Sequence, residues 1–306
     1  MKTETTSSYL RWPEENAGRS SDFFQWSHPG SNLCLDFHGD PIKAQLVVFS
    51  DGNHHMALRE CLDSFSRKYE ELSYIFYATT PPGPIVNMLK RGGLQLGNLI
   101  INIQPHVFIS PPNILEGLIE QGVMTTHSPF VENRGNVLLV RKGNPKNITA
   151  ASDIMDETVR IFLSHPEREK ASYTSYYDTL KALIAVNEMD SDFLREKILQ
   201  GQIVYGERIH HREAPQALVD GAADVAPVFY HLALRYLRIF PDFFDIVPLG
   251  GSVEEPVPLP GNVVGTTSRG LVGDGGIWGG RLLDYLISDE AIKIYENHGL
   301  NSRIKG

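Results

Sequence analysis

The sequence predicts an α/β protein with two lobes. Short apolar runs alternate with segments in which apolar residues recur at helical spacing, and the links between them are short. The first run covers 44–50, and a helical pattern from Met56 to Tyr69 follows it at once. This order recurs twice more in the first 121 residues, which favours a mainly parallel sheet. A chain of 306 residues also exceeds what one hydrophobic core usually holds, so two lobes are expected.

The remaining predicted elements continue this order along the chain. The predicted strands cover 73–78, 105–110, 136–141, 159–163 and 223–229, and the predicted helices begin at 84 or cover 113–121, 175–186, 192–199, 214–220, 232–237 and 281–298. Residues 248–280 are rich in Pro and Gly and are predicted to be irregular. Residues 1–43 show no period of 2 or 3.6, so we expect an irregular N-terminal extension.

Composition and charge exclude several classes of protein. Hydrophobic residues make up 42% of the chain and charged residues 21%, which is typical of a soluble globular protein. The formal charge of -9, from 37 acidic and 28 basic side chains, offers no basic surface, so nucleic acid is not an expected partner. The cysteines Cys34 and Cys61 form no CxxC pair, so neither a thiolate zinc site nor a disulfide framework is expected.

The apolar runs and the N-terminus lead to an expectation about location. The longest apolar runs are far shorter than the ~20 residues that span a bilayer, so no membrane segment is expected. Residues 1–8 contain an early glutamate and no apolar stretch, so they do not form a secretory signal. The sequence therefore predicts a cytoplasmic protein, or a periplasmic one if its start is incomplete.

Four short motifs, in order along the chain, carry a family resemblance. They are Phe108-Ile109-Ser110-Pro111-Pro112, Asn133-Arg134-Gly135-Asn136, Gly221-Ala222-Ala223-Asp224-Val225 and Leu286-Ile287-Ser288-Asp289. Together with the first strand and helix they resemble the type II periplasmic binding proteins, over residues 44–300. Within that fold the motifs are most similar to the molybdate, tungstate and sulfate binding proteins.

The resemblance implies two Rossmann-like lobes joined by two crossover strands, which enclose a small anion by hinge closure. It places lobe one at 44–130 with 231–306, and lobe two at 131–230. The hinge would include Asn133-Arg134-Gly135. The same fold class has some catalytic members, so the resemblance alone leaves open whether the protein is an enzyme. The chain contains no GxSxG or HExxH motif, so we expect binding without catalysis or a cofactor.

Helix starts are the predicted ligand donors, because their first N–H groups are unpaired and carry a partial positive charge. The predicted ligand residues are Asn53 and His54, Thr79 and Thr80, Ser172 and Tyr173 at three such starts, and His211, Arg212 and Tyr230 in lobe two. The same residue types also serve as ordinary helix caps. Convergence of these side chains on one cavity distinguishes the two roles.

Three histidines support a second hypothesis, which is an enzyme or a metal-handling protein. The resemblance brings His54, His211 and His231 to the cleft, and neutral imidazole binds Zn, Fe or Ni. The alternative is that these side chains are solvated or packed. Adjacent histidines point in different directions, so at most one of each neighbouring pair faces inward.

The leading hypothesis from the sequence is a solute-binding protein for a small oxyanion of the molybdate or tungstate type. If the protein is cytoplasmic, it is expected to act as a sensor, a store or a delivery factor. A third hypothesis is an interaction module. In that case the extension, residues 1–43, docks a protein partner or a second copy in a homo-oligomer.

Overall fold

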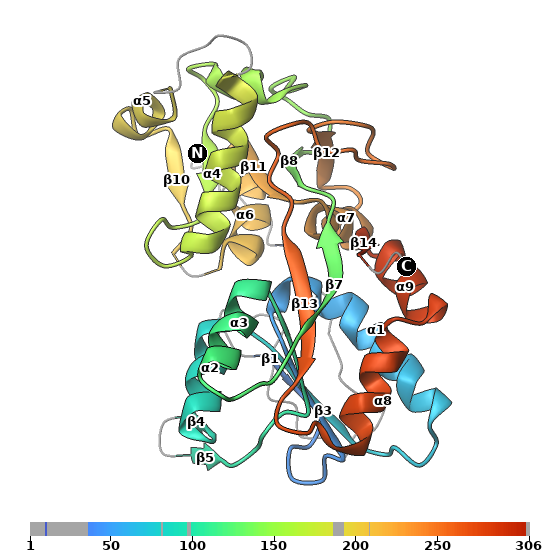
Figure 1. Ribbon diagram of the computed structural model, residues 1–306. Helices are drawn as coiled ribbons and strands as arrows, with labels where there is room; N and C mark the ends of the chain where they lie inside the picture. Colours follow the sequence, from blue (N-terminus) through green and yellow to red (C-terminus); the bar gives the residue numbers. More distant parts are fainter. Residues whose placement is uncertain are drawn as a thin grey trace, which may run out of the picture. The chain divides into compact units, whose positions relative to one another are not determined.

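The computed structural model describes Leu10 and residues 36–80, 82–96, 99–185, 193–207 and 209–303 (Figure 1). These residues form two compact lobes. Lobe one consists of 36–132 and 265–303, and lobe two consists of Leu10 and 133–264. Each lobe has its own sheet and its own buried core, so the prediction of a two-lobe α/β protein is confirmed.

The division of the chain differs from the predicted one at residues 231–264. This segment was predicted to belong to lobe one, but it packs in lobe two. Strand β12 (Phe244–Pro248) pairs with β8 (Asn136–Arg141) over its whole length, and helix α7 (Tyr230–Ile239) packs on both strands. Pairing between strands so far apart in sequence is not visible in a local apolar pattern.

The sheet of lobe one combines parallel and antiparallel strands. In sheet order the strands are β1 (Asp36–His38), β3 (Ile75–Thr79), β2 (Leu46–Ser50), β6 (Val107–Ser110), β13 (Thr266–Leu271), β7 (Ser128–Asn133) and β14 (Leu300–Ser302). Strand β2 is parallel to β3 and β6, whereas β13 is antiparallel to β6 and β7, and β1 is antiparallel to β3. The predicted parallel sheet is therefore correct for β3, β2 and β6 only.

Helices cover both faces of this sheet, because alternate strand residues point to opposite sides. Leu46 and Val48 of β2 belong to one buried core, and Val47 and Phe49 belong to the other. The first core includes α1 (His55–Lys68), α8 (Gly276–Leu286) and α9 (Asp289–Asn297), and the second includes α2 (Pro82–Arg91) and α3 (Pro112–Glu120). The short 3-10 helix η1 (Gly52–His54) precedes α1, and β4 (Leu94–Leu96) pairs with β5 (Leu99–Ile101).

Two elements near the C-terminus correct the sequence analysis. The segment predicted as irregular, 248–280, contains β13 and the first turn of α8. Strand β13 has little apolar character and contains Gly270, where a Cβ atom would lie 2.6 Å from the Thr126 carbonyl oxygen. The predicted helix 281–298 is interrupted, because the Ser288 side chain accepts a hydrogen bond from the Ala291 N–H at 3.4 Å and starts α9.

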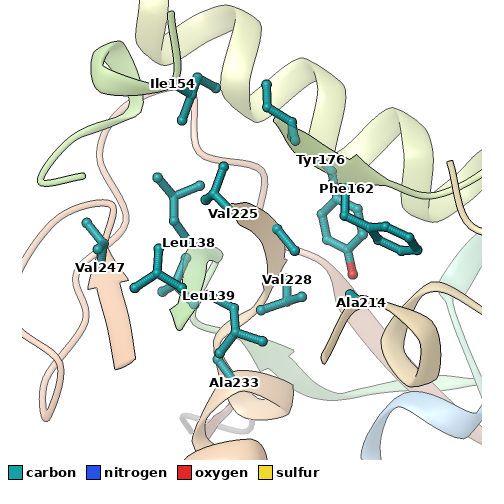
Figure 2. Close-up of a cluster of buried hydrophobic side chains, with 14 of the residues drawn as sticks. Leu138, Leu139, Ile154, Phe162, Tyr176, Ala214, Val225, Val228, Ala233 and Val247 are labelled. Atoms are coloured by element: carbon teal, nitrogen blue, oxygen red, sulfur yellow. The ribbon is translucent and has the colours of Figure 1, made fainter. Parts of the chain in front are cut away.

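Lobe two has a sheet of the same mixed kind. In sheet order its strands are β10 (Ile203–Tyr205), β9 (Ile161–Leu163), β11 (Val225–Phe229), β8 and β12. Strand β9 is parallel to β10 and β11, and β8 is antiparallel to β11 and β12. Figure 2 shows the buried core of this lobe, in which Leu138 and Leu139 of β8 lie beside Val225 and Val228 of β11.

The helices of lobe two are η2 (Ala151–Met155), α4 (Lys170–Ala185), α5 (Phe193–Leu199), α6 (His210–Val219) and α7. Three of them, α4, α6 and α7, start earlier than predicted. The predicted ranges 175–186 and 214–220 omit the first turns of α4 and α6, which are polar. As a result His211 and Arg212 belong to the first turn of α6.

Most of the predicted N-terminal extension, residues 1–9 and 11–35, lies outside the described residues. Leu10 is buried in the core of lobe two, and its N–H donates to Gln216 Oε1 at 3.2 Å. Asp36–His38 form β1 at the edge of the lobe-one sheet, so this part of the extension is regular, contrary to the prediction. Among the helices of the described chain, none has the length and apolar character required to cross a membrane.

An asparagine pair joins the beginning and the end of the lobe-two segment 133–264. Asn262 Oδ1 accepts a hydrogen bond from the Asn136 N–H at 2.8 Å, and Asn262 Nδ2 donates to the Asn136 carbonyl at 2.9 Å. Asn136 Nδ2 donates to Thr179 Oγ1 at 2.7 Å. Gly135 has a φ of 73°, and a Cβ atom there would lie 2.9 Å from Asn262 Oδ1. This cluster holds together the two ends of the lobe-two segment 133–264.

The substitution Asn262→Ala is expected to lower the free energy of unfolding by about 2 kcal/mol, because it leaves the buried amide and carbonyl of Asn136 without these partners. Urea unfolding followed by circular dichroism measures the change. Asn87→Ala, at an exposed position of α2, serves as the control and should stay within about 0.5 kcal/mol of the unmodified protein. Equal stability of the two variants would contradict the role of the pair.

Candidate functional site

The carboxyl ends of parallel strands are where open α/β sheets place their ligand sites. In lobe one, β2, β3 and β6 end together at Ser50, Thr79 and Ser110, because Ser50 is in register with Thr79 and with Ile109. The Thr80 N–H extends this row by donating to the Ser50 carbonyl at 3.1 Å. We name the set of Ser50, Thr79, Thr80 and Ser110 the hydroxyl edge.

Three hydroxyl groups of this edge are buried without a hydrogen-bond partner in the described protein. Thr79, Thr80 and Ser110 expose 2%, 1% and 0% of their surface, and their Oγ atoms have no partner. Each such group costs about 1–3 kcal/mol, so each buried hydroxyl without a partner requires an explanation. Each can donate a hydrogen bond to a ligand oxygen atom. Thr79 and Thr80 lie at the end of β3 and Ser110 at the end of β6, on either side of β2 in the sheet.

The fourth hydroxyl, that of Ser50, belongs to a network inside lobe one. Ser50 Oγ lies 2.9 Å from His54 Nε2, and His54 Nδ1 lies 3.0 Å from the Tyr295 hydroxyl of α9. Burial lowers the pKa of His54 to about 3, so the imidazole is neutral. Both ring nitrogens have partners within the lobe, and His54 is therefore not available to an anion or a metal, contrary to the sequence analysis.

Asp51 occupies the helix start that follows β2. It is 4% exposed, and its Oδ1 accepts a hydrogen bond from the Asn53 N–H at 3.2 Å. Burial raises the pKa of Asp51 to about 6, although the hydrogen bond from Asn53 acts in the opposite direction. The Asn53 N–H, a donor predicted to bind the ligand, is thus bonded to the protein's own carboxyl group. The Asn53 side chain is half-buried.

Prolines reduce the N–H donors at the next two helix starts. Pro82 and Pro84 lie in the first turn of α2, and Pro112 begins α3. Proline has no backbone N–H, so these starts offer fewer donors than helix geometry alone provides. The hydroxyl side chains are consequently the main donors at this edge of lobe one.

In lobe two the parallel strands end beside one further buried hydroxyl. Ser164 directly follows β9, has an exposed fraction of 0%, and its Oγ has no hydrogen-bond partner among the described residues. Tyr230, after β11, is buried, and its hydroxyl donates to the Val253 carbonyl at 2.9 Å. Tyr230 was a predicted ligand residue, but its polar atom is already used inside the lobe.

Carboxylates occupy the start of α6, near the predicted residues His211 and Arg212. Glu169 accepts a hydrogen bond from the His210 N–H at 2.9 Å, and Glu213 accepts one from the Ile209 N–H at 2.9 Å. Burial raises the pKa of Glu169 to about 7. An anion at this helix start would meet two acidic groups instead of free N–H donors.

The other predicted residues of lobe two lie on separate elements. Ser172 and Tyr173 are in the first turn of α4, where the Tyr173 ring stacks on Tyr177 at 5.4 Å between centroids. His231 is buried in α7, with its ring parallel to Phe229 at 5.7 Å. Within the described parts of both lobes, no group of three or more His, Cys, Asp or Glu side chains is arranged to hold a metal ion.

Four polar residues near the strand ends were not predicted as site residues: Ser50, Asp51, Ser110 and Ser164. Each is polar and either ends a buried strand or directly follows one. Their place at a strand end is the sequence signal that could have identified them. Polar residues at the carboxyl end of a parallel strand reach the ligand edge even when they are not part of a helix start.

The chain matches the family of bacterial extracellular solute-binding proteins over residues 46–301 and belongs to this family. No curated protein sequence matches it. The predicted type II periplasmic binding protein fold is confirmed by this match and by the solved structures that resemble the chain. The family description, extracellular, does not support the predicted cytoplasmic location.

Three of these solved structures show how widely the ligand varies on this fold. The periplasmic molybdate-binding protein of Azotobacter vinelandii is 13% identical with a TM-score of 0.57, covering 86% of this chain and 100% of its own. The sulfate-binding protein SubI of Mycobacterium tuberculosis H37Rv is 14% identical with a TM-score of 0.60, covering 85% and 87%. Iron-bound HitA of Pseudomonas aeruginosa is 13% identical with a TM-score of 0.57, covering 82% and 83%. At these identities the likeness shows the fold alone.

Proposed function

We propose that this solute-binding protein binds a small oxyanion of the molybdate or tungstate type through the hydroxyl edge of lobe one. The observation that carries the proposal is that three buried hydroxyls at these strand ends, on Thr79, Thr80 and Ser110, have no partner among the described residues. Hydroxyl donors complement the oxygen atoms of an oxyanion, and neutral donors can hold an anion that is shielded from water. The molybdate-binding and sulfate-binding proteins among the similar structures support an anionic ligand.

The proposal covers ligand binding alone. A role as a cytosolic sensor, store or delivery factor depends on a location that the family description does not support. The enzyme or metal-handling hypothesis depended on His54, His211 and His231. We do not pursue it, because the ring nitrogens of His54 are both engaged within lobe one.

Isothermal titration of the whole chain with molybdate, tungstate and sulfate at pH 6 tests the proposal. One anion should bind per chain, and a titration with ferric citrate provides the comparison suggested by the iron-bound relative. The proposal fails if none of the three oxyanions produces heat at millimolar concentration.

The substitution Thr79→Val is expected to weaken oxyanion binding about tenfold, which is the loss of roughly one hydrogen bond. The free protein should keep its stability or gain up to about 1 kcal/mol, because the variant removes a buried hydroxyl that has no partner in the described part of the chain. Titration and urea unfolding of the same preparation measure both quantities.

Thr179→Val is the matched control in lobe two. Its hydroxyl accepts hydrogen bonds from Asn136 Nδ2 at 2.7 Å and from the Val263 N–H at 2.9 Å, so this variant should lose stability. If Thr79→Val also loses stability and binds oxyanions as tightly as the unmodified protein, its hydroxyl is structural and the proposed edge is wrong.

A further inference from the structure

Asp51 directly follows Ser50 at the end of β2, which lies between β3 and β6 in the sheet. The Ser50 carbonyl accepts a hydrogen bond from the Thr80 N–H at 3.1 Å, and the Asp51 N–H donates to the Ile109 carbonyl at 3.1 Å. The backbone at Asp51 is thus held between the end of β3 and the residue that precedes Ser110. The residue is 4% exposed. The strand ends that carry the neutral hydroxyl donors therefore also carry a residue that becomes negative when it ionises.

The titratable groups that face Asp51 come from η1, α1 and α9. His54 Nε2 lies 3.5 Å from Asp51 Oδ1, but this imidazole is neutral because burial lowers its pKa to about 3. His55, the first residue of α1, uses its Nδ1 to donate to the Gly52 carbonyl at 2.9 Å. Tyr295 of α9 keeps its proton, since burial raises its pKa well above the ordinary value.

The neighbours contributed by β3 and β6 are hydroxyl groups, which do not titrate. Thr80 and Ser110 are buried on either side of Asp51. A pair formed by Asp51 and His54 is not an ion pair, despite its short distance, because the ring carries no charge. The ionisation of Asp51 therefore depends on the pH and on the charge of a ligand bound at the edge.

We propose that Asp51 is the residue that determines which charge state the edge accepts, and that a fully deprotonated oxyanion binds together with one proton on this carboxyl group. The inference rests on the proposed function, and it assigns a specificity-determining role to a residue of this chain. In the protonated form Asp51 adds an O–H donor to the edge, whereas in the ionised form it repels the ligand.

Proton linkage gives the expected size of the effect. Burial already raises the pKa of Asp51 to about 6 in the free protein, so most molecules are ionised at pH 8 and protonated at pH 5. A bound dianion close by raises that pKa further. The association constant should thus be constant below about pH 6 and fall up to about tenfold for each pH unit above it.

Titrations with sulfate and molybdate between pH 6 and pH 8.5 test this inference, because the charge of neither anion changes over this range. Repeating the titration at pH 8 in two buffers of different ionisation enthalpy counts the protons taken up, and one proton per anion is expected. Asp51→Asn keeps the shape and the acceptor for Asn53 but cannot ionise. This variant should bind with the low-pH affinity of the unmodified protein at every pH, with no proton uptake.

Glu71→Gln is the matched control, because it makes the same charge change on the surface of lobe one, at a side chain paired with Arg281. It should keep the pH dependence of the unmodified protein. The inference is overturned if the unmodified protein binds equally well at pH 6 and pH 8.5, or if Asp51→Asn keeps the pH dependence. Failure of every variant to bind any of the anions at any pH would instead refute the proposed function itself.

Discussion

Replacement of His54 by alanine is expected to lower the free energy of unfolding of lobe one by about 3 kcal/mol. The ring lies between Ser50 Oγ at 2.9 Å and the Tyr295 hydroxyl at 3.0 Å, and it is 3% exposed. Its removal leaves the buried Tyr295 hydroxyl without this partner and opens a cavity under the hydroxyl edge. Urea unfolding near pH 7 measures the loss.

His298→Ala is the control for this variant. His298 Nε2 lies 2.8 Å from Glu60 Oε2 in a pair on the surface of lobe one, where such contacts contribute up to about 1 kcal/mol. If His54→Ala is no less stable than His298→Ala, the buried network does not hold the edge. His54 would then have to be considered again as a ligand residue.

Acid is expected to destabilise the protein only below about pH 4.5, because each lobe contains a buried histidine and a carboxyl group with the opposite pH dependence. Lobe one contains His54, whose pKa burial lowers to about 3, and Asp51, whose pKa burial raises to about 6. Lobe two contains His210, whose pKa burial likewise lowers to about 3, and Glu169, whose pKa burial raises to about 7.

The two kinds of group act in opposite directions as the pH falls. Below pH 6.5 the unfolded chain binds a proton on each histidine that the folded chain does not bind, so stability falls by about 1.4 kcal/mol per pH unit for each. A carboxyl group with a raised pKa is protonated first in the folded chain. It therefore increases stability from its raised pKa down to about pH 4, where the unfolded chain is also protonated.

Urea unfolding between pH 3 and pH 8 should consequently show a nearly flat region from about pH 6 to pH 4.5, followed by a steep loss. Asp51→Asn removes the opposing contribution in lobe one. This variant should lose about 3 kcal/mol of stability between pH 6 and pH 4, relative to the unmodified protein over the same interval. A steep loss of the unmodified protein already at pH 6, or the same profile for Asp51→Asn, would show that the histidines and carboxyls do not offset each other.

The sequence predicted the strands whose two faces are both buried. Strands β2, β6, β8 and β11 are nearly continuous apolar runs, and burial on both faces is what produces such runs. Strand β13 lies beside β6 in the sheet but carries Thr, Ser, Arg and Gly, so its place follows from pairing across the sheet and not from its own composition. Its position depends on Gly270, which allows the Thr126 backbone to approach.

The lobe boundary depended on tertiary contacts for the same reason. Residues 231–264 contain a helix and a strand that either lobe could accommodate on sequence grounds. Pairing of β12 with β8 assigns the segment to lobe two.

The sequence by itself determined the α/β class, the order of the main elements, and the location of Thr79 and Thr80 at a strand end. Only the tertiary structure showed which polar groups have partners. The ring nitrogens of His54 contact Ser50 and Tyr295, and the Tyr230 hydroxyl donates to Val253. The hydroxyl of Ser110 has no partner among the described residues. The physical reason is that a hydrogen bond satisfies a buried polar group through a neighbour that can lie anywhere along the chain. Tyr295 is 241 residues from His54, so no local pattern could reveal that contact.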